Sequence, residues 1–149
     1  MSPTNFFENC KFLVSGFSLK DLPEDTGSEV AFCGRSNSGK SSLLNCLTKK
    51  RKLAKTSKTP GRTQSINIFS LDDYGENRIS DLPGYGFAKV SKQPKKSWGK
   101  LITDYLNSRR SLVGLVIVMD SRQPFRDSDL TLINWALQTN TPLVVILNM

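Results

Sequence analysis

The chain has 149 residues, of which 38% are hydrophobic and 23% charged, a size and composition that fit one folded domain and exclude a disordered tail. Its longest apolar run, Leu112–Met119, is too short to cross a bilayer, and Glu8 and Lys11 interrupt the N-terminus where a signal peptide would be apolar. The net charge is +8, histidine is absent, and the three cysteines lack C-x-x-C spacing, so we expect reduced thiols, a cytoplasmic location, no disulfide framework and no zinc site.

The first half of the chain predicts three strands and one helix. An apolar strand is expected at Glu29–Cys33 and a helix at about Lys40–Leu47. Residues 49–64 are basic, rich in turn-forming residues and without apolar periodicity, which predicts a mobile loop. Two further strands, in residues 65–71 and 78–84, are joined by a hairpin turn with the sequence DDYGEN.

The second half continues the alternation of helices and strands. After a loop at residues 84–94, a helix is predicted at about Lys95–Arg109, then a buried strand at Leu112–Asp120. A helix at Asp127–Gln138, with acidic residues in its first turn, and a last strand at Leu143–Leu147 follow. Trp98 and Trp135 lie at helical spacing with other apolar residues and are expected in the core. The pattern predicts a single α/β domain, residues 1–149, with a mostly parallel sheet and an N-terminal extension, residues 1–28.

Residues Gly34–Ser41 fit the phosphate-loop pattern G-x-x-x-x-G-K-[ST] without a mismatch. They follow a predicted strand and open a predicted helix, which is the context that this pattern requires. Glycines let the backbone N–H groups surround phosphates, and the helix N-terminus adds partial positive charge. Lys40 would reach the β- and γ-phosphates, and the Ser41 hydroxyl would be a ligand of Mg²⁺.

Two further motifs can be interpreted once the phosphate loop is recognised. Asp81 begins a D-L-P-G sequence at the end of a predicted strand, where an aspartate of P-loop hydrolases holds Mg²⁺, usually through water, and Gly84 would meet the γ-phosphate. Alone, Asp81 would be read as a turn residue. Thr63, in the basic T-P-G-R-T-Q stretch, would offer Mg²⁺ a second hydroxyl in a loop that orders with GTP. As an isolated threonine it would carry no meaning.

The segments GRSNSGKSSLLN, SKTPGRTQSINIF and DLPGYGFAKV together resemble the EngB-type (YihA/YsxC) bacterial ribosome-biogenesis GTPases, and the similarity runs from about Phe6 to Leu147. The resemblance implies a Ras-like P-loop GTPase fold with helices on both faces of the sheet. It also implies GTP and GDP with Mg²⁺ as ligands, maturation of the large ribosomal subunit as the task, and a link to cell division and septation.

The resemblance also implies roles for individual residues. Lys40 and Thr63 take part in hydrolysis, and Ser41, Thr63 and, through water, Asp81 hold Mg²⁺. The nucleotide-binding residues come from the phosphate loop and the two switch segments: Gly34, Arg35, Ser36, Asn37, Ser38, Gly39, Lys40, Ser41, Ser42, Gly61, Arg62, Thr63, Gln64, Ser65, Asp81, Leu82, Pro83 and Gly84. Arg35 and Arg62 are expected in exposed loops, either as plain surface arginines or in contact with phosphate or RNA.

Hydrolysis by the chain alone is expected to be slow. Tyr85 stands where Ras-like relatives have the glutamine that orients the attacking water, and a tyrosine cannot act in the same way. Asn37 either helps to hold K⁺ beside the phosphates, as in several related GTPases, or merely suits a turn conformation.

The chain ends where the resemblance places the guanine-recognition motif [NT]-K-x-D. Asn148 fills the first position, and Met149 stands where the lysine is expected. We therefore expect weakened guanine affinity and specificity, a sheet without its closing strand and helix, and an exposed apolar edge at Leu143–Leu147. Either a shortened reading of a longer gene or a variant with weakened function explains this ending.

Three functions compete at this point. The first is a monomeric GTPase switch in ribosome assembly, whose basic switch regions meet ribosomal RNA. The second is a shortened, hydrolysis-deficient remnant that binds the ribosome or RNA through its charge. A P-loop ATPase or small-molecule kinase is disfavoured by the T-P-G-R-T-Q and D-L-P-G sequences. The basic residues lie in two stretches, and the alternative to binding RNA is that both are simply solvated faces. The stretches are Lys49, Lys50, Arg51, Lys52, Lys55, Lys58 and Arg62, and Lys89, Lys92, Lys95, Lys96 and Lys100.

Overall fold

The computed structural model describes residues 3–36, 38–50, 65–85 and 92–148. Strands and helices alternate as predicted, and none of the described helices has the length and apolar character needed to cross a membrane. The elements, in chain order, are α1 (Pro3–Glu8), β1 (Lys11–Gly16), the 3-10 helix η1 (Leu19–Asp21), β2 (Ser28–Gly34), α2 (Lys40–Thr48), β3 (Ile66–Ser70), β4 (Asn77–Asp81), α3 (Lys92–Ser108), β5 (Leu112–Asp120), α4 (Asp127–Gln138) and β6 (Leu143–Asn148).

The described strands form one sheet in the order β1-β3-β4-β2-β5-β6. The pairs β2–β4, β2–β5 and β5–β6 are parallel, whereas β1–β3 and β3–β4 are antiparallel. The parallel part therefore contains the strand that leads into the phosphate loop, with β4 and β5 on its two sides. Since the carboxyl ends of parallel neighbours meet at one edge, the loops after β2, β4 and β5 lie together there.

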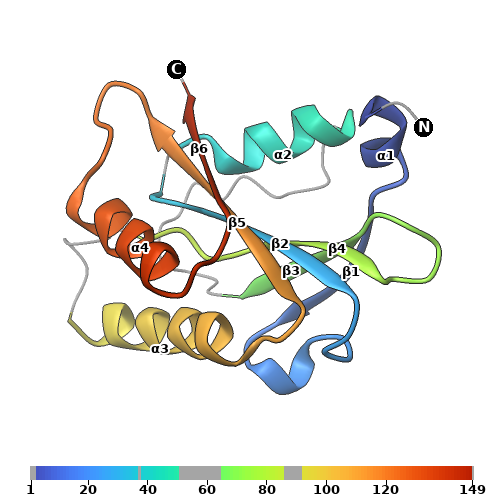
Figure 1. Cartoon of the computed structure of the whole chain (residues 1–149), viewed down its shortest axis with the longest axis horizontal. Helices are drawn as coiled ribbons and strands as arrows, with labels where there is room; N and C mark the ends of the chain where they lie inside the picture. The colour runs from blue at the N-terminus through green and yellow to red at the C-terminus, as the bar shows by residue number, and fades with distance from the viewer. Residues whose placement is uncertain (1–2, 37, 51–64, 86–91, 149) are drawn as a thin grey trace.

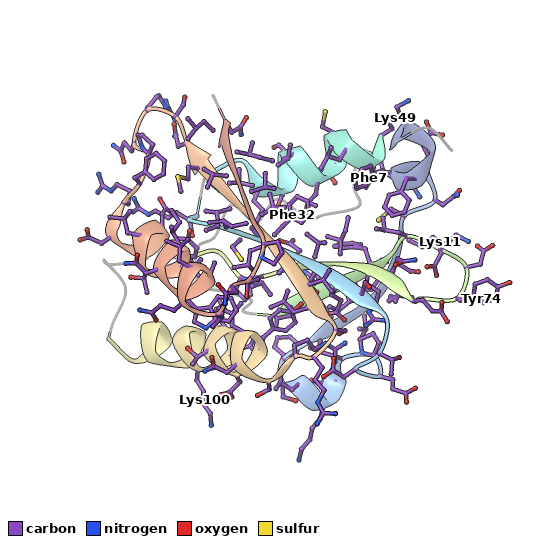
Figure 2. All side chains as sticks on the ribbon, in the orientation of Figure 1. Phe7, Lys11, Phe32, Lys49, Tyr74 and Lys100 are labelled. Atoms are coloured by element: carbon purple, nitrogen blue, oxygen red, sulfur yellow. The ribbon has the colours of Figure 1, made fainter. Side chains whose placement is uncertain are left out.

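Helices cover both faces of the sheet, as the resemblance implies. Figure 1 shows α1 and α2 on one side and α3 and α4 on the other. On the α2 side, Phe32 of β2 packs with Leu44 of α2, and Phe7 of α1 packs against the same group (Figure 2). On the other side, Cys33 of β2 shares a cluster with Tyr105 of α3 and further residues of α4. Because successive residues of β2 point to opposite faces, both sides of this strand are buried.

The hairpin predicted between residues 65 and 84 is confirmed, and its turn is held by one carboxylate. Asp72 accepts hydrogen bonds from the backbone N–H groups of Tyr74 and Asn77, both at 2.9 Å, and of Glu76 at 3.1 Å. Gly75 has a φ of +71°, a conformation that side chains with a Cβ rarely adopt. The DDYGEN sequence therefore acts as a turn through the Asp72 carboxylate and the freedom of Gly75.

The N-terminal extension contributes a strand that the sequence pattern did not predict. Strand β1 pairs with β3 along one edge of the sheet, with Lys11 opposite Ser70 and Gly16 opposite Ile66. Most of its side chains are exposed or only half-buried, so it lacks the alternation of apolar and polar residues by which a half-buried strand is recognised. Helix α3 begins at Lys92, three residues before the predicted start, because Pro94 is tolerated in the first turn of a helix.

Strand β6 forms the other edge of the described sheet. It pairs with β5 from Leu143 to Asn148, and Val144 and Leu147 are 56% and 53% exposed. The expected exposed apolar edge at this strand is confirmed.

A buried group of charges, which we call the Glu29 cluster, lies at the amino end of β2. Glu29 accepts hydrogen bonds from Arg78 Nε at 2.7 Å, Tyr105 Oη at 2.7 Å and Ser80 Oγ at 3.1 Å, and it forms an ion pair with Arg109. Burial by itself raises the pKa of Glu29, but the bonds from Arg109, Tyr105 and Arg78 outweigh it and bring the pKa below the ordinary value of 4.5. The cluster ties β2 and β4 to the end of α3.

Candidate functional site

The phosphate-loop residues connect the carboxyl end of β2 to the first turn of α2, which is the context predicted for them. A Cβ on Gly34 would lie 2.6 Å from Ser38 Oγ and 2.8 Å from the carbonyl oxygen of Val118, so the loop closes tightly on glycine. Gly39 has a φ of +91° immediately before Lys40 begins the helix. The loop is therefore shaped by two positions that exclude side chains.

Lys40 and Asp81 are brought together although they are 41 residues apart. The Lys40 ammonium donates hydrogen bonds to the Asp81 carboxylate and to the carbonyl oxygen of Leu82, and the two charged side chains are only 11% and 7% exposed. Asp81 reaches this place because it pairs with Phe32, near the end of the parallel strand β2. The two motifs singled out in the sequence thus form one polar site at the carboxyl edge of the sheet.

The D-L-P-G segment also packs on the phosphate loop through its last residue. A Cβ on Gly84 would lie 3.1 Å from Ser36 Oγ, and the next residue, Tyr85, forms a parallel bridge with Arg35. Leu82 and Pro83 are buried. There is little room between the two segments for anything larger than glycine at position 84.

Three polar atoms of the phosphate loop are shielded from solvent and have no hydrogen-bond partner in the described part of the protein. They are Arg35 Nε, Ser36 Oγ and Ser38 Oγ. Arg35 is half-buried, so the expectation of an exposed loop arginine is wrong for this residue. Buried polar atoms without a partner are uncommon in folded proteins, so these three atoms are candidates for contact with a polar ligand.

The donor set at this edge fits Mg²⁺. The Asp81 carboxylate lies against the Lys40 ammonium, and Ser41, a second oxygen-bearing residue, follows Lys40 in the chain. Mg²⁺ prefers oxygen ligands, and a hydroxyl with one or two carboxylates leaves positions for phosphate oxygens and water. Within the described residues, no group of three or more His, Cys, Asp or Glu side chains offers a competing metal site.

Asn148, assigned by the resemblance to guanine recognition, contacts the phosphate loop. Its Nδ2 donates a hydrogen bond to the carbonyl oxygen of Ser38 at 3.1 Å. A Cβ on Gly39 would lie 1.9 Å from the same nitrogen. The last residue of strand β6 therefore contacts the phosphate loop directly, which the sequence did not predict.

Tyr85 turns its side chain away from the phosphate loop. It is 1% exposed, and its hydroxyl donates a hydrogen bond to the carboxylate of Asp129 in α4. Burial first, and then this bond, raise the pKa of Tyr85 far above its usual range. This placement agrees with the inference that Tyr85 does not orient water. The sequence pattern marks Asp129 only as an acidic residue in the first turn of a helix.

Several expected site residues lie outside the described part of the chain: Asn37, Gly61, Arg62, Thr63 and Gln64. The 49–64 loop lies there as well, apart from Lys49 and Lys50. Ser65, at the start of β3, is buried with its hydroxyl 3.3 Å from that of Ser15 in β1. Ser42 is exposed on α2. The structure thus groups the phosphate loop with the D-L-P-G segment and places Ser65 beside β1.

The basic stretches are described in part. Lys49 pairs with Glu8 at 3.0 Å, and Lys50 donates to the carbonyl oxygen of Cys10, so both hold α1 against the end of α2. Lys100 extends from α3 into solvent (Figure 2). Trp135 is only partly buried and donates to Asn107 at 3.3 Å, and the side chain of Trp98 lies outside the described part. Trp135, which was expected in the core, therefore lies only partly within it.

Comparison with known proteins agrees with this geometry. The family model of 50S ribosome-binding GTPases matches residues 29–149. "Probable GTP-binding protein EngB" of Alteromonas mediterranea is 53% identical over 143 residues, which are 96% of this chain and 66% of that protein. The protein of the same name from Aliivibrio fischeri is 50% identical over 147 residues, 99% of this chain and 67% of the relative. The chain thus spans about two thirds of the length of these relatives.

Solved structures give the same fold. A crystal structure of a probable GTP-binding protein engB matches with a TM-score of 0.64 at 23% identity, covering 81% of this chain and 70% of the other. NFeoB from S. thermophilus, bound to GDP.AlF4- and K+, matches with a TM-score of 0.56 at 29% identity, covering 82% and 44%. The chain belongs to the family of 50S ribosome-binding GTPases and, within it, to the EngB group of GTP-binding proteins.

Proposed function

We propose that the chain binds GTP and GDP with Mg²⁺ and hydrolyses GTP slowly, as a switch in the assembly of the large ribosomal subunit. The observation that carries the proposal is the contact between Lys40 of the phosphate loop and Asp81 of the D-L-P-G segment. Family membership supports guanine nucleotides as the ligands, and the family description supports the ribosome as the partner. A cytoplasmic monomer fits this role.

The residues would act in the following way. Lys40 would exchange its bond to Asp81 for the β- and γ-phosphates, since a phosphate carries more charge than one carboxylate. The Ser41 hydroxyl would hold Mg²⁺, with the released Asp81 carboxylate acting through water and Thr63 as a further ligand. Mg²⁺ held there would supply positive charge to the phosphates. The Gly84 N–H would face the γ-phosphate.

Slow hydrolysis follows from the position of Tyr85. Its hydroxyl is engaged with Asp129 in the core, so it does not orient an attacking water. We propose that another group completes the site, either a component of the ribosome or K⁺ held near Asn37. The structural likeness to NFeoB, which was solved with GDP.AlF4- and K+, supports K⁺ as a candidate for this group.

A titration with a fluorescent GDP analogue tests the proposal. The expected result is binding at micromolar protein, displaced more effectively by GTP and GDP than by ATP, and weakened by removal of Mg²⁺ for GTP. The Lys40→Met variant is the control, since it keeps most of the side-chain volume and removes the ammonium; circular dichroism verifies that it remains folded at the temperature of the titration. No binding by the wild-type chain would reject the nucleotide-switch function, and equal displacement by ATP would favour a P-loop ATPase or kinase.

Binding to ribosomal subunits tests the second half of the proposal. We expect preference for the large over the small subunit, dependence on bound GTP, and a steep loss with added salt, since basic residues meet phosphates. Binding that ignores the nucleotide would support the alternative of a basic ribosome-binding remnant. The resemblance extends the proposal to cell division and septation, and filamentous growth after depletion is the expected phenotype.

A further inference from the structure

Tyr85 is bound to the phosphate loop through its main chain. Its N–H donates to the carbonyl oxygen of Gly34 at 3.2 Å, and its carbonyl oxygen accepts from the N–H of Ser36 at 2.9 Å. These two bonds enclose Arg35 and form a short parallel bridge. The position of the Tyr85 backbone therefore sets the path of the first residues of the phosphate loop.

The side chain of Tyr85 is held from the opposite direction. Its hydroxyl donates to one carboxylate oxygen of Asp129, which is itself 1% exposed. The second carboxylate oxygen accepts the backbone N–H of Arg126 at 3.1 Å, so Asp129 also caps the start of α4. The partial positive charge of a helix N-terminus stabilises a carboxylate in the first turn. Tyr85 is thus fixed between the phosphate loop and the first turn of α4.

Gly84 transmits this constraint to the site. It directly precedes Tyr85, and the space above its Cα is filled by Ser36, whose Oγ would lie 3.1 Å from an added Cβ. Gly84 therefore lies close against Ser36 of the loop, and the peptide bond to Tyr85 ties its backbone to that of the tyrosine. The N–H of Gly84 is the group expected to face the γ-phosphate, so a small displacement matters for GTP and much less for GDP.

We propose that Tyr85 and Asp129 form a buried link that positions Gly84 and the phosphate loop and couples the nucleotide site to α4. Both are positioning residues, since neither is placed to touch the nucleotide. The effect on nucleotide discrimination rests on the proposed GTP-binding function. The effect on the loop itself does not depend on it.

The link also explains why this position carries tyrosine in a core environment. A phenylalanine would fill the same volume, but the Asp129 carboxylate would lose a donor while remaining buried. Leaving a buried charged acceptor without a partner is more costly than losing an ordinary hydrogen bond. The hydroxyl keeps its proton because burial and the neighbouring carboxylate raise the pKa of Tyr85.

Hydrogen exchange without nucleotide tests the positioning role. Tyr85→Phe removes only the hydroxyl, and Asp129→Asn offers one acceptor oxygen for two donors. The matched control is Tyr105→Phe, which removes the hydroxyl of the other buried tyrosine, bound to Glu29 and Ser80 at the opposite end of the sheet. We expect faster exchange at residues 34–36, 38, 82, 84 and 85 in the two link variants, and unchanged exchange there in the control.

Nucleotide discrimination provides the second measurement. The affinity for a non-hydrolysable GTP analogue should fall about ten-fold more than the affinity for GDP in Tyr85→Phe, the size expected for one lost bond to a charged group. Tyr105→Phe should leave the ratio unchanged even if it lowers the melting temperature. The double variant Tyr85→Phe/Asp129→Asn should lose no more than the more affected single variant, since both act through one bond.

The outcomes are distinguishable. Equal exchange of the phosphate loop in wild type and link variants would overturn the proposal, whatever the nucleotide results. Faster loop exchange with an unchanged GTP-to-GDP ratio would overturn the coupling to Gly84. Absence of nucleotide binding in the wild type would instead reject the proposed function, and the exchange experiment would still decide the link.

Discussion

The Lys40 ammonium lies against the Asp81 carboxylate, joining the first residue of α2 to the last residue of β4 in a nearly buried ion pair. Lys40→Met would leave Asp81 buried without its partner, which typically destabilises a protein by about 3–5 kcal/mol. Asp81→Asn in the same chain should recover most of that loss, because it removes the unpaired charge. Urea unfolding at neutral pH measures both. Additive losses in the double variant would contradict an interaction between the two side chains.

Gly39 and Asn148 form a second pair with a sharp steric prediction. Gly39→Ala places a Cβ 1.9 Å from Asn148 Nδ2, at a φ of +91°. We expect a large loss of stability and of GDP-analogue binding. In Gly39→Ala/Asn148→Ala the nearest remaining atom, the Cβ of residue 148, is 3.9 Å away, so only the backbone strain of about 1–2 kcal/mol persists.

The control for this pair is Asn148→Ala alone, which removes the bond to Ser38 and should cost about 1 kcal/mol. Thermal unfolding of the three variants gives the comparison. A double variant that is less stable than Gly39→Ala would show that the contact with Asn148 does not limit position 39.

The Glu29 cluster predicts a dependence of stability on pH. The pKa of Glu29 is lowered in the folded protein, so its contribution is fully present above the unfolded value and is lost as pH falls through the folded value. Glu29→Gln should be less stable by about 3–5 kcal/mol at neutral pH, since Arg78 and Arg109 lose a buried partner. The difference from wild type should shrink in acid. Urea midpoints measured between neutral pH and pH values below 4.5 provide the check, and a constant difference would contradict the prediction.

The three thiols should differ in reactivity. Cys46 is exposed on α2, whereas Cys10 and Cys33 are buried, and burial raises their pKa values to about 11 and about 12. A thiol reagent at neutral pH should label one cysteine rapidly and the other two only upon unfolding, because the thiolate is the reactive form. Cys46→Ser, which leaves the core intact, should abolish the rapid phase. A rapid phase that remains would show that a buried cysteine is accessible.

The proposed role of K⁺ predicts that the rate of GTP hydrolysis depends on the salt. If K⁺ supplies charge beside the phosphates, the chain should hydrolyse GTP faster in KCl than in NaCl at equal ionic strength, and Asn37→Ala should remove the difference. Equal rates in the two salts would remove K⁺ from the proposal. In either salt, turnover by the protein alone should remain slow, because Tyr85 is held in the core.

Elements with strong apolar patterns were predicted well from the sequence. The bounds of β5 and α4 agree residue for residue with the predicted Leu112–Asp120 and Asp127–Gln138, because a continuous apolar run and a helical repeat with an acidic first turn define them. Strand β1 was missed because an edge strand with exposed Phe12 and Leu13 has no pattern that distinguishes it from a loop. Its pairing partner, β3, lies at least 50 residues further along the chain and decides its conformation.

One contact of the candidate site could be predicted from the sequence and another could not. The meeting of Lys40 and Asp81 was predictable because each motif follows a strand of the parallel sheet, and parallel neighbours end at the same edge. The bond between Tyr85 and Asp129 was not, because it joins residues 44 positions apart and depends on how α4 packs on the sheet. No local pattern in the sequence encodes that packing.

Strand β2 carries the Glu29 cluster at one end and the phosphate loop at the other, separated by its seven residues, or roughly 20 Å of extended chain. The two ends are stabilised by different partners: Arg78, Tyr105 and Arg109 at the first, Asp81 and Asn148 at the second. Stabilising substitutions can therefore be placed around the amino end, outside the Glu29 cluster itself, at a distance from the candidate nucleotide site. A chain improved in this way would tolerate costly changes at the phosphate loop that the natural sequence does not.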